Sequence, residues 1–254
     1  MVRTTPYFIQ ISDTHLVADT NLEPYGVNPY ANLERIITHI FHLDPPPAFV
    51  MFTGDLISDD DPQSYRHLKL LTERLPSPTY FAMGNHDLRR PFRHLFLGED
   101  PPGSEPYYYA FDAAGYRFVV LDSLVEGEVA GKLDAAQLAW LDDTLTSVSE
   151  QPTVVFMHHP PVPTGVDWLD AHAFGNGDDL LDILAKHRQV QRLFFGHVHM
   201  PIQITERGVQ FTSVPSSAYQ FGDTVTAPKV WSGSPGYGIV HLFEGKLSSR
   251  VIYL

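Results

Sequence analysis

Residues 7–15 read YFIQISDTH, a short apolar run typical of a buried β-strand that leads directly into Asp13-Thr14-His15. The same order, an apolar run and then a polar group, recurs along the chain. It is found at Gly54-Asp55, at Gly84-Asn85-His86-Asp87 and at Gly196-His197-Val198-His199, and the run 153–157 leads into His158-His159. Open α/β sheets place their ligand sites at the carboxyl ends of strands. The five motifs are therefore predicted to converge at one edge of a sheet.

Between the first strands, apolar residues recur at helical spacing, which predicts helices alternating with strands. The expected helices span about 29–41, 65–75, 134–145 and 178–186, and the later strands 202–206, 209–213, 237–243 and 247–253. This order predicts an α/β fold in which two packed sheets carry helices on their outer faces. We expect one domain over residues 1–254, in which the β-rich portion from about 202 to 254 completes the second sheet and the rim of the substrate site.

Charge and composition narrow the possible partners. The 254 residues include 30 Asp and Glu but only 17 Lys and Arg, a formal net charge of −13, which disfavours stable binding to nucleic acid. No run reaches the roughly 18 apolar residues that a membrane span needs. Residues 1–6 contain no apolar signal segment, so we expect a cytoplasmic protein. The chain has no cysteine, which excludes thiolate metal ligands.

The first two motifs offer hard oxygen and imidazole ligands. If the backbone stays extended, Asp13 and His15 point to the same side and suit a divalent transition metal. Asp55 follows Gly54, and its two carboxylate oxygens can bridge two metal ions. Taken alone, each motif fits a polar turn at least as well. Their common position after apolar runs is what favours a metal site.

The other motifs extend this set. Asn85 offers a neutral amide oxygen, and His86 is left for acid chemistry. The prolines that follow His158-His159 force an extended chain, in which adjacent side chains point apart. We therefore expect His158 to face the site and His159 to lie outward or behind the ligands. His197 and His199, two residues apart, can both reach a metal pair.

With these motifs in place, the chain resembles the calcineurin-like metallophosphoesterases. Within that superfamily it is most similar to the class III cyclic nucleotide phosphodiesterases and their glycerophosphodiesterase relatives. The likeness runs from about residue 7 to 222 and includes Pro215–Phe221, which matches a Pro-Ser-x-x-x-Gln-Phe pattern. The resemblance implies a four-layer αββα sandwich of two mixed β-sheets flanked by helices. Because many members of the superfamily are homodimers, the resemblance also implies that this chain can form a homodimer.

The resemblance implies two divalent metal ions held by seven residues. Asp13, His15 and His199 would hold the first metal, Asn85, His158 and His197 the second, and Asp55 would bridge both. This donor set suits Fe, Mn, Zn or Co alike. His86 would contact the phosphate and protonate or stabilise the leaving group, so that His86 and Asp55 are the expected catalytic residues.

The expected activity is hydrolysis of small phosphodiesters, such as cyclic nucleotides or glycerophosphodiesters, by a metal-activated hydroxide. A phosphomonoesterase or a nucleotide pyrophosphatase on the same site is the alternative, and a non-catalytic scaffold is a remote one. The expected substrate-binding residues are Asn85, His86, His159 and Tyr219. Further loop residues that can reach the substrate are Tyr25, Asn28, Arg89, Arg90, Trp168, His172 and Gln220.

Overall fold

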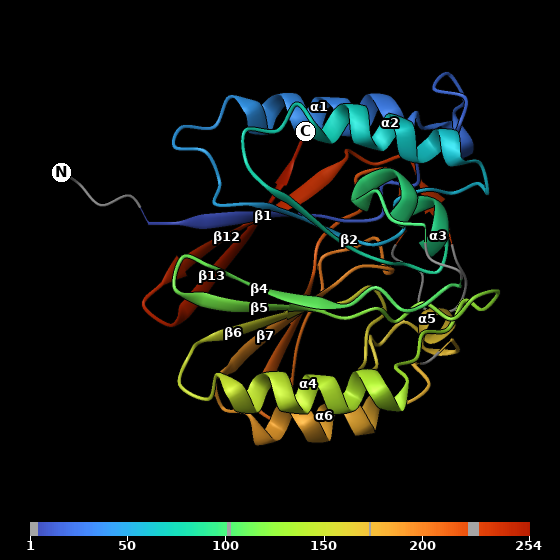
Figure 1. Cartoon of the computed structure of the whole chain (residues 1–254). Coiled ribbons are helices and arrows are strands. Elements are labelled where there is room, and N and C mark those ends of the chain that lie inside the picture. The colour runs from blue at the N-terminus through green and yellow to red at the C-terminus, as the bar shows by residue number, and fades with distance from the viewer. Residues whose placement is uncertain (1–4, 101–102, 173, 223–228) are drawn as a thin grey trace.

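The computed structural model describes residues 5–100, 103–172, 174–222 and 229–254. The expectation of a cytoplasmic protein was based on residues 1–6, of which residues 1–4 lie outside the described residues. Two β-sheets are stacked face to face and helices cover the outer face of each, as Figure 1 shows. The predicted α/β sandwich of two mixed sheets flanked by helices is confirmed.

The first sheet has the strand order β13-β12-β1-β2-β3. Its parallel part comprises β1 (Tyr7–Ile11), β2 (Val50–Thr53) and β3 (Thr79–Ala82), joined by the crossover helices α1 (Pro29–Phe41) and α2 (Pro62–Thr72). Both helices begin where the sequence provides a capping side chain and then proline. Asn28 accepts a hydrogen bond from the Ala31 N–H, and Asp61 accepts one from the Gln63 N–H.

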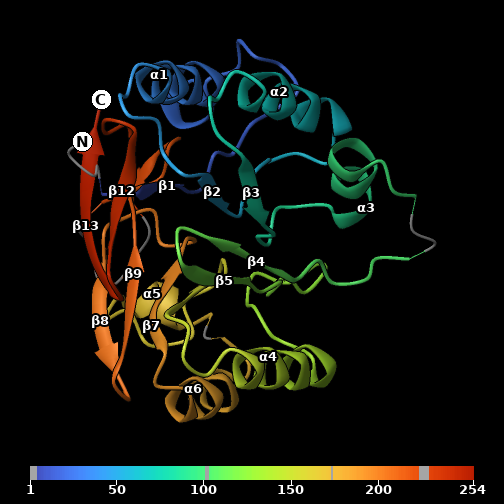
Figure 2. The same ribbon diagram turned by 60° about the vertical axis from the view of Figure 1, so that its left-hand side comes forward.

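The second sheet has the order β4-β5-β6-β7-β9-β8. Its strands are β4 (Tyr109–Ala113), β5 (Tyr116–Val120), β6 (Thr153–Phe156), β7 (Val190–Phe195), β8 (Gln203–Glu206) and β9 (Val209–Ser213). Helices α4 (Ala135–Ser147) and α6 (Gly177–Lys186) cover its outer face, at the bottom of Figures 1 and 2. Short elements that the sequence did not predict complete the chain: η1 (Pro24–Gly26), α3 (Arg89–Phe92), η2 (Arg93–Leu97), α5 (Asp167–Asp170), β10 (Gln220–Phe221) and β11 (Val230–Trp231).

The C-terminal portion serves both sheets, which differs from the expectation that residues 202–254 complete the second sheet. Strands β8 and β9 do join that sheet, but β12 (Gly236–Phe243) and β13 (Lys246–Tyr253) join the first one. The reason lies in β1, whose five residues are all buried. A strand in that position needs a hydrogen-bonding neighbour on each edge, and β2 occupies one edge while β12 pairs antiparallel along the other.

Alternation along β1 explains why the sheets stack. Tyr7, Ile9 and Ile11 face α1 and α2, whereas Phe8 points between the two sheets. There Phe8 packs against Phe49, which directly precedes β2, and against three rings of the second sheet, Phe118, Phe156 and Phe194, at centroid distances of 4.9–5.8 Å. This layer aligns the strand ends that carry the motifs. Within the described residues, none of the helices has the length and apolar character needed to span a membrane.

Candidate metal centre

The five motifs meet at one place, just beyond the carboxyl ends of β1, β2, β3, β6 and β7. One group there consists of Asp13, His15, Asp55 and His199, whose ligand atoms all lie within 4.8 Å of one another. The Nε2 atoms of His15 and His199 are 3.0 Å apart. All four residues are buried. The residues predicted for the first metal are therefore brought together in a geometry that can hold a cation.

The second group adjoins the first. His158 and His197 lie together with His159 within 4.8 Å, and Nδ1 of His197 is 3.1 Å from Oδ1 of Asn85. Nε2 of His158 is 3.3 Å from Oδ2 of Asp55. The chain thus has two clusters that can hold two metal ions, as predicted. The individual ligand assignments stay predictions.

Asp55 joins the two clusters through a single oxygen. Its Oδ2 lies 3.7 Å from His15 Nε2 in one cluster and 3.3 Å from His158 Nε2 in the other. Its Oδ1 accepts a 3.0 Å hydrogen bond from the main-chain N–H of His86. The sequence suggested that both oxygens bridge the metals, but the structure uses Oδ1 to hold the loop of His86 and directs Oδ2 to both clusters.

Outer partners orient three of the imidazoles. Nδ1 of His158 donates to the Thr53 carbonyl at 2.8 Å and Nδ1 of His199 to the Tyr219 carbonyl at 2.8 Å. Nδ1 of His15 lies 2.7 Å from Oγ of Ser58. A carbonyl can only accept, so His158 and His199 each carry a proton on Nδ1 and direct Nε2 towards the centre. The sequence did not point to Ser58 or to these carbonyls.

The backbone of the ligand loops is left-handed rather than extended. Asp13, His15, Asp55, His197 and His199 have φ of 54°, 45°, 48°, 70° and 52°. Such values are uncommon for residues other than glycine and cluster at functional sites. The prediction that an extended chain turns Asp13 and His15 to the same side is therefore wrong. The two side chains converge because the loop curls at both residues.

Glycine is required where these loops touch. A Cβ at Gly84 would lie 2.3 Å from the main-chain N and from Oδ1 of Asp55, and one at Gly54 would lie 2.6 Å from Nδ1 of His158. Any other residue would push the loops apart. Gly54 and Gly84 thus set the distance between neighbouring ligands.

The electrostatics of the centre favour a cation. Burial lowers the pKa of His15 and of His197 to about 3, which leaves both imidazoles neutral and able to ligate a metal at neutral pH. Burial also acts to lower the pKa of His158, but Asp55 and Asp13 outweigh it and raise that pKa to about 9. Oδ2 of Asp13 and Nε2 of His158 are buried without a hydrogen-bond partner. These two ligand atoms lack a hydrogen-bond partner and lie beside the carboxylates of Asp13 and Asp55. Such a site fits divalent metal ions.

His159 lies behind the centre and is buried, although its ring is 4.9 Å from that of His197. Nδ1 of His159 bonds Oγ of Ser123 at 2.8 Å, and Nε2 bonds the Val129 carbonyl at 3.1 Å. With both ring nitrogens engaged, His159 supports the neighbouring loop 123–129. A role in binding substrate stays a prediction.

A cavity of about 300 Å³ opens over the two clusters. Asn85, His86, Tyr219, Trp168 and His172 all line it, so these expected substrate-binding residues do face the centre. Phe221, Glu128 and Val129 line it as well, and sequence reasoning did not select them as substrate-binding residues.

Other candidates are placed differently. Asn28 caps α1, and Gln220 donates to the Ser216 carbonyl at 2.7 Å. The ring of Tyr25 lies 4.8 Å from that of Tyr219, tilted by 57°. Arg90 lines a small cavity beside Arg66 and His94. None of these four belongs to the residues that line the cavity over the metal clusters.

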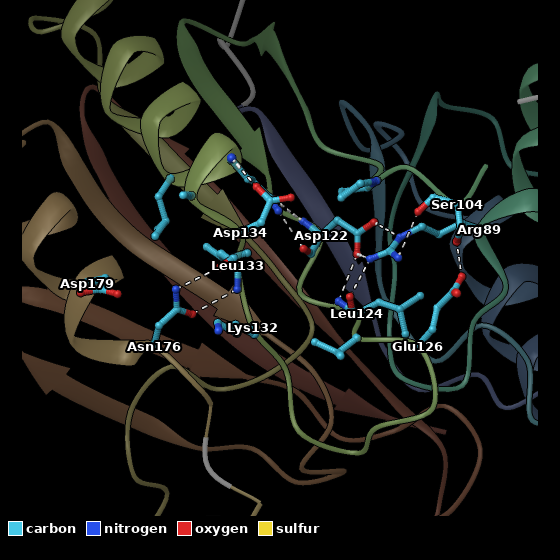
Figure 3. A pocket seen from close by; sticks show the side chains of 15 residues that line it. Arg89, Ser104, Asp122, Leu124, Glu126, Lys132, Leu133, Asp134, Asn176 and Asp179 are labelled. Atoms are coloured by element: carbon cyan, nitrogen blue, oxygen red, sulfur yellow. Dashed lines mark hydrogen bonds and ion pairs between the residues drawn. The ribbon is translucent and has the colours of Figure 1, made fainter. Parts of the chain in front are cut away.

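Arg89 is likewise committed elsewhere, in the separate pocket shown in Figure 3. Its guanidinium is buried and donates to both oxygens of Asp122, at 2.7 and 3.0 Å. Because the Arg89 guanidinium is paired with Asp122, it is not available to bind a phosphate at the metal clusters.

Comparison with known proteins agrees with the geometry. The family model described as calcineurin-like phosphoesterase matches residues 6–201. The chain belongs to this family. Among its curated relatives, the 3′,5′-cyclic adenosine monophosphate phosphodiesterase CpdA of Pseudomonas aeruginosa is 30% identical, over 96% of this chain and 88% of that protein. A 3′,5′-cyclic-nucleotide phosphodiesterase of Nostoc sp. is 28% identical, over 95% of this chain and 90% of that protein.

The fold is that of the calcineurin-like phosphoesterases too. A dimetal phosphatase from Danio rerio superposes with a TM-score of 0.73 at 19% identity, covering 97% of this chain and 96% of that one. The predicted family, and with it the prediction of a metal-dependent phosphodiester hydrolase, is confirmed.

Proposed function

We propose that this calcineurin-like phosphoesterase hydrolyses 3′,5′-cyclic nucleotides to nucleoside monophosphates. The observation that carries the proposal is the pair of ligand clusters joined through Oδ2 of Asp55. Two divalent metal ions, when bound, lower the pKa of water and stabilise negative charge on phosphorus-bound oxygens. The names of its relatives support the substrate class.

We assign the ligands as the family resemblance implies. Asp13, His15 and His199 would hold one metal, Asn85, His158 and His197 would hold the other, and Asp55 would be shared. His86 is exposed and lines the cavity, and its main-chain N–H is tied to Asp55. This position lets the His86 imidazole reach the substrate without ligating a metal. We assign to His86 the proton that the leaving alkoxide needs.

The cavity favours a diester over a monoester. A diester carries one negative charge, whereas a monoester carries nearly two at neutral pH. Among the described residues that line the cavity, none is Lys or Arg, and Glu128 adds a negative charge. The metal ions therefore have no lysine or arginine of the described cavity lining to help them neutralise a second phosphate charge. This supports the phosphodiesterase over the phosphomonoesterase alternative.

A hydrolysis panel with defined metals tests the proposal. The protein, stripped of metal and reloaded with Mn, Fe, Zn or Co, is assayed with cyclic AMP, cyclic GMP, glycerophosphocholine and AMP. We expect the highest kcat/KM for a cyclic nucleotide and little activity on AMP. Faster hydrolysis of AMP would point to the phosphomonoesterase. No activity with any metal, on protein that binds two metal ions, would revive the scaffold alternative.

Several expectations stay predictions: a single domain over residues 1–254, a homodimer, a cytoplasmic location and the lack of stable nucleic-acid binding. Light scattering tests the dimer and cell fractionation the location. A gel-shift assay with duplex DNA at low salt tests the last point, because the charge of −13 should prevent a complex.

A further inference from the structure

One wall of the cavity over the metal clusters is aromatic. It is lined by Phe221 in β10, by Tyr219 directly before that strand, and by Trp168 on α5. The ring of Trp168 meets that of Phe221 edge-on, with a centroid distance of 4.8 Å and an interplanar angle of 88°. We call Trp168, Tyr219 and Phe221 the aromatic wall. Gly127, Glu128 and Val129 also line the cavity, and none of them is aromatic.

The aromatic wall adjoins the ligands of the first metal. Phe221 stacks on His199 with a centroid distance of 4.2 Å and an interplanar angle of 21°. Tyr219 stacks on His15 at 5.0 Å and 27°. Phe221 thus lies in ring contact both with the metal ligand His199 and with Trp168. In a 3′,5′-cyclic nucleotide the base is likewise separated from the phosphorus by one ring, the ribose.

The aromatic wall suits a flat aromatic group, such as a nucleobase, better than a small polar group. Aromatic side chains that face a ligand cavity bind nucleobases by stacking on their π-faces, whatever the base. A glycerol or choline group would gain little from such a surface. Packing against the metal ligands accounts for the positions of Phe221 and Tyr219. Trp168 packs partly against the core of the second sheet and also lines the cavity, where its indole adds to the aromatic surface.

We propose that the aromatic wall, with Trp168 as its outer member, holds the nucleobase of the substrate. This rests on the proposed function and assigns it a specificity-determining residue. The base lies against Trp168 and Phe221 while the cyclic phosphate occupies the metal clusters. Because stacking is tolerant of base identity, the wall selects nucleotides over other diesters without discriminating strongly between adenine and guanine.

Paired substrates test this assignment. The metal-loaded enzyme and its Trp168→Ala variant are assayed with cyclic AMP and with 1-O-methylribose 3′,5′-cyclic phosphate, which keeps the ribose and phosphate but lacks the base. We expect Trp168→Ala to lower kcat/KM for cyclic AMP by about 5- to 100-fold, mainly through KM, because one stacked base is lost. The value for the base-free diester should change by less than about twofold, and Trp168→Phe should restore most of the loss.

Trp140→Ala is the matched control, because Trp140 lies on α4 and packs against Tyr108, away from the cavity. It should leave both substrates unchanged, and metal content should stay at two ions per chain in every variant. An equal loss on both substrates, or none on cyclic AMP, would overturn the nucleobase assignment while leaving the proposed function intact. A wild-type enzyme that cleaves the base-free diester but not cyclic AMP would instead overturn both.

Discussion

The hydroxyl of Tyr65 donates a hydrogen bond of 3.0 Å to Oδ1 of the buried carboxylate of Asp87. The same carboxylate accepts bonds from the main-chain N–H groups of Gly84, at 2.8 Å, and of Leu56, at 3.0 Å. Asp87 thus connects the loops that follow β2 and β3, and Tyr65 reaches it from α2. Burial and the charge of Asp55 raise the pKa of Asp87 to about 8, against these bonds, which lower it.

Replacing Tyr65 with phenylalanine should loosen this connection. Tyr65→Phe removes one donor from a buried acceptor, and we expect the free energy of unfolding to fall by about 1–3 kcal/mol. Urea denaturation measures this. Metal affinity should fall as well, because Asp55 and Asn85 are the chain neighbours of Leu56 and Gly84, whose N–H groups bond Asp87. Tyr237→Phe is the control: its hydroxyl bonds His39 at 2.8 Å, away from the cavity, and it should leave metal affinity unchanged. If Tyr65→Phe and Tyr237→Phe changed metal affinity equally, Asp87 would not be what holds the two ligand loops together.

Gly84→Ala should separate the loops directly. The new Cβ would lie 2.3 Å from the main-chain N of Asp55, and backbone cannot move aside cheaply. We expect a loss of about 1–3 kcal/mol in unfolding free energy, with a drop in activity. At Gly175 the atoms nearest to an added methyl group would lie 3.5 Å away, so Gly175→Ala should shift stability by less than about 0.5 kcal/mol. Thermal denaturation and kcat/KM report both, and a tolerant Gly84 would show that the loops are free to move.

Asn85→Ala should remove one ligand of the second metal. We expect elemental analysis to show a decline from two metal ions per chain towards one. Activity should drop at least about 100-fold, equivalent to about 2.7 kcal/mol of barrier. Asn21→Ala, at an exposed residue whose side chain bonds Asp19, should retain both ions. Full metal occupancy in Asn85→Ala would mean that Asn85 is no ligand.

His86→Ala should reveal the proton donor through the leaving group. Both metal ions should remain, because the link to Asp55 uses the main-chain N–H. General acid catalysis contributes about 10²–10⁴-fold, so cyclic AMP, which has a poor alkoxide leaving group, should slow at least about 100-fold. Bis(p-nitrophenyl) phosphate needs no proton and should be affected far less. An equal loss on the two substrates would argue against His86 as an acid, and His94→Ala, at an exposed histidine, is the control.

The fold was largely predictable because its signals are local. The sequence predicted a strand at 209–213, which is β9, and helical spacing of apolar residues predicted a helix at about 29–41, which is α1. The sheet to which β12 belongs was not predictable in this way. That choice depends on the open edge of β1, more than 200 residues earlier in the chain.

By itself, the sequence determined which residues can bind metals and that they follow strands, because residue type and hydrophobic periodicity are properties of neighbours in the chain. Only the tertiary structure decided which atoms act. The proton of His158 is placed by the Thr53 carbonyl, 105 residues away, and Oδ1 of Asp55 is occupied by the N–H of His86. The left-handed turns at Asp13 and His199, and the aromatic wall beside them, likewise depend on packing between distant segments, which no local pattern encodes.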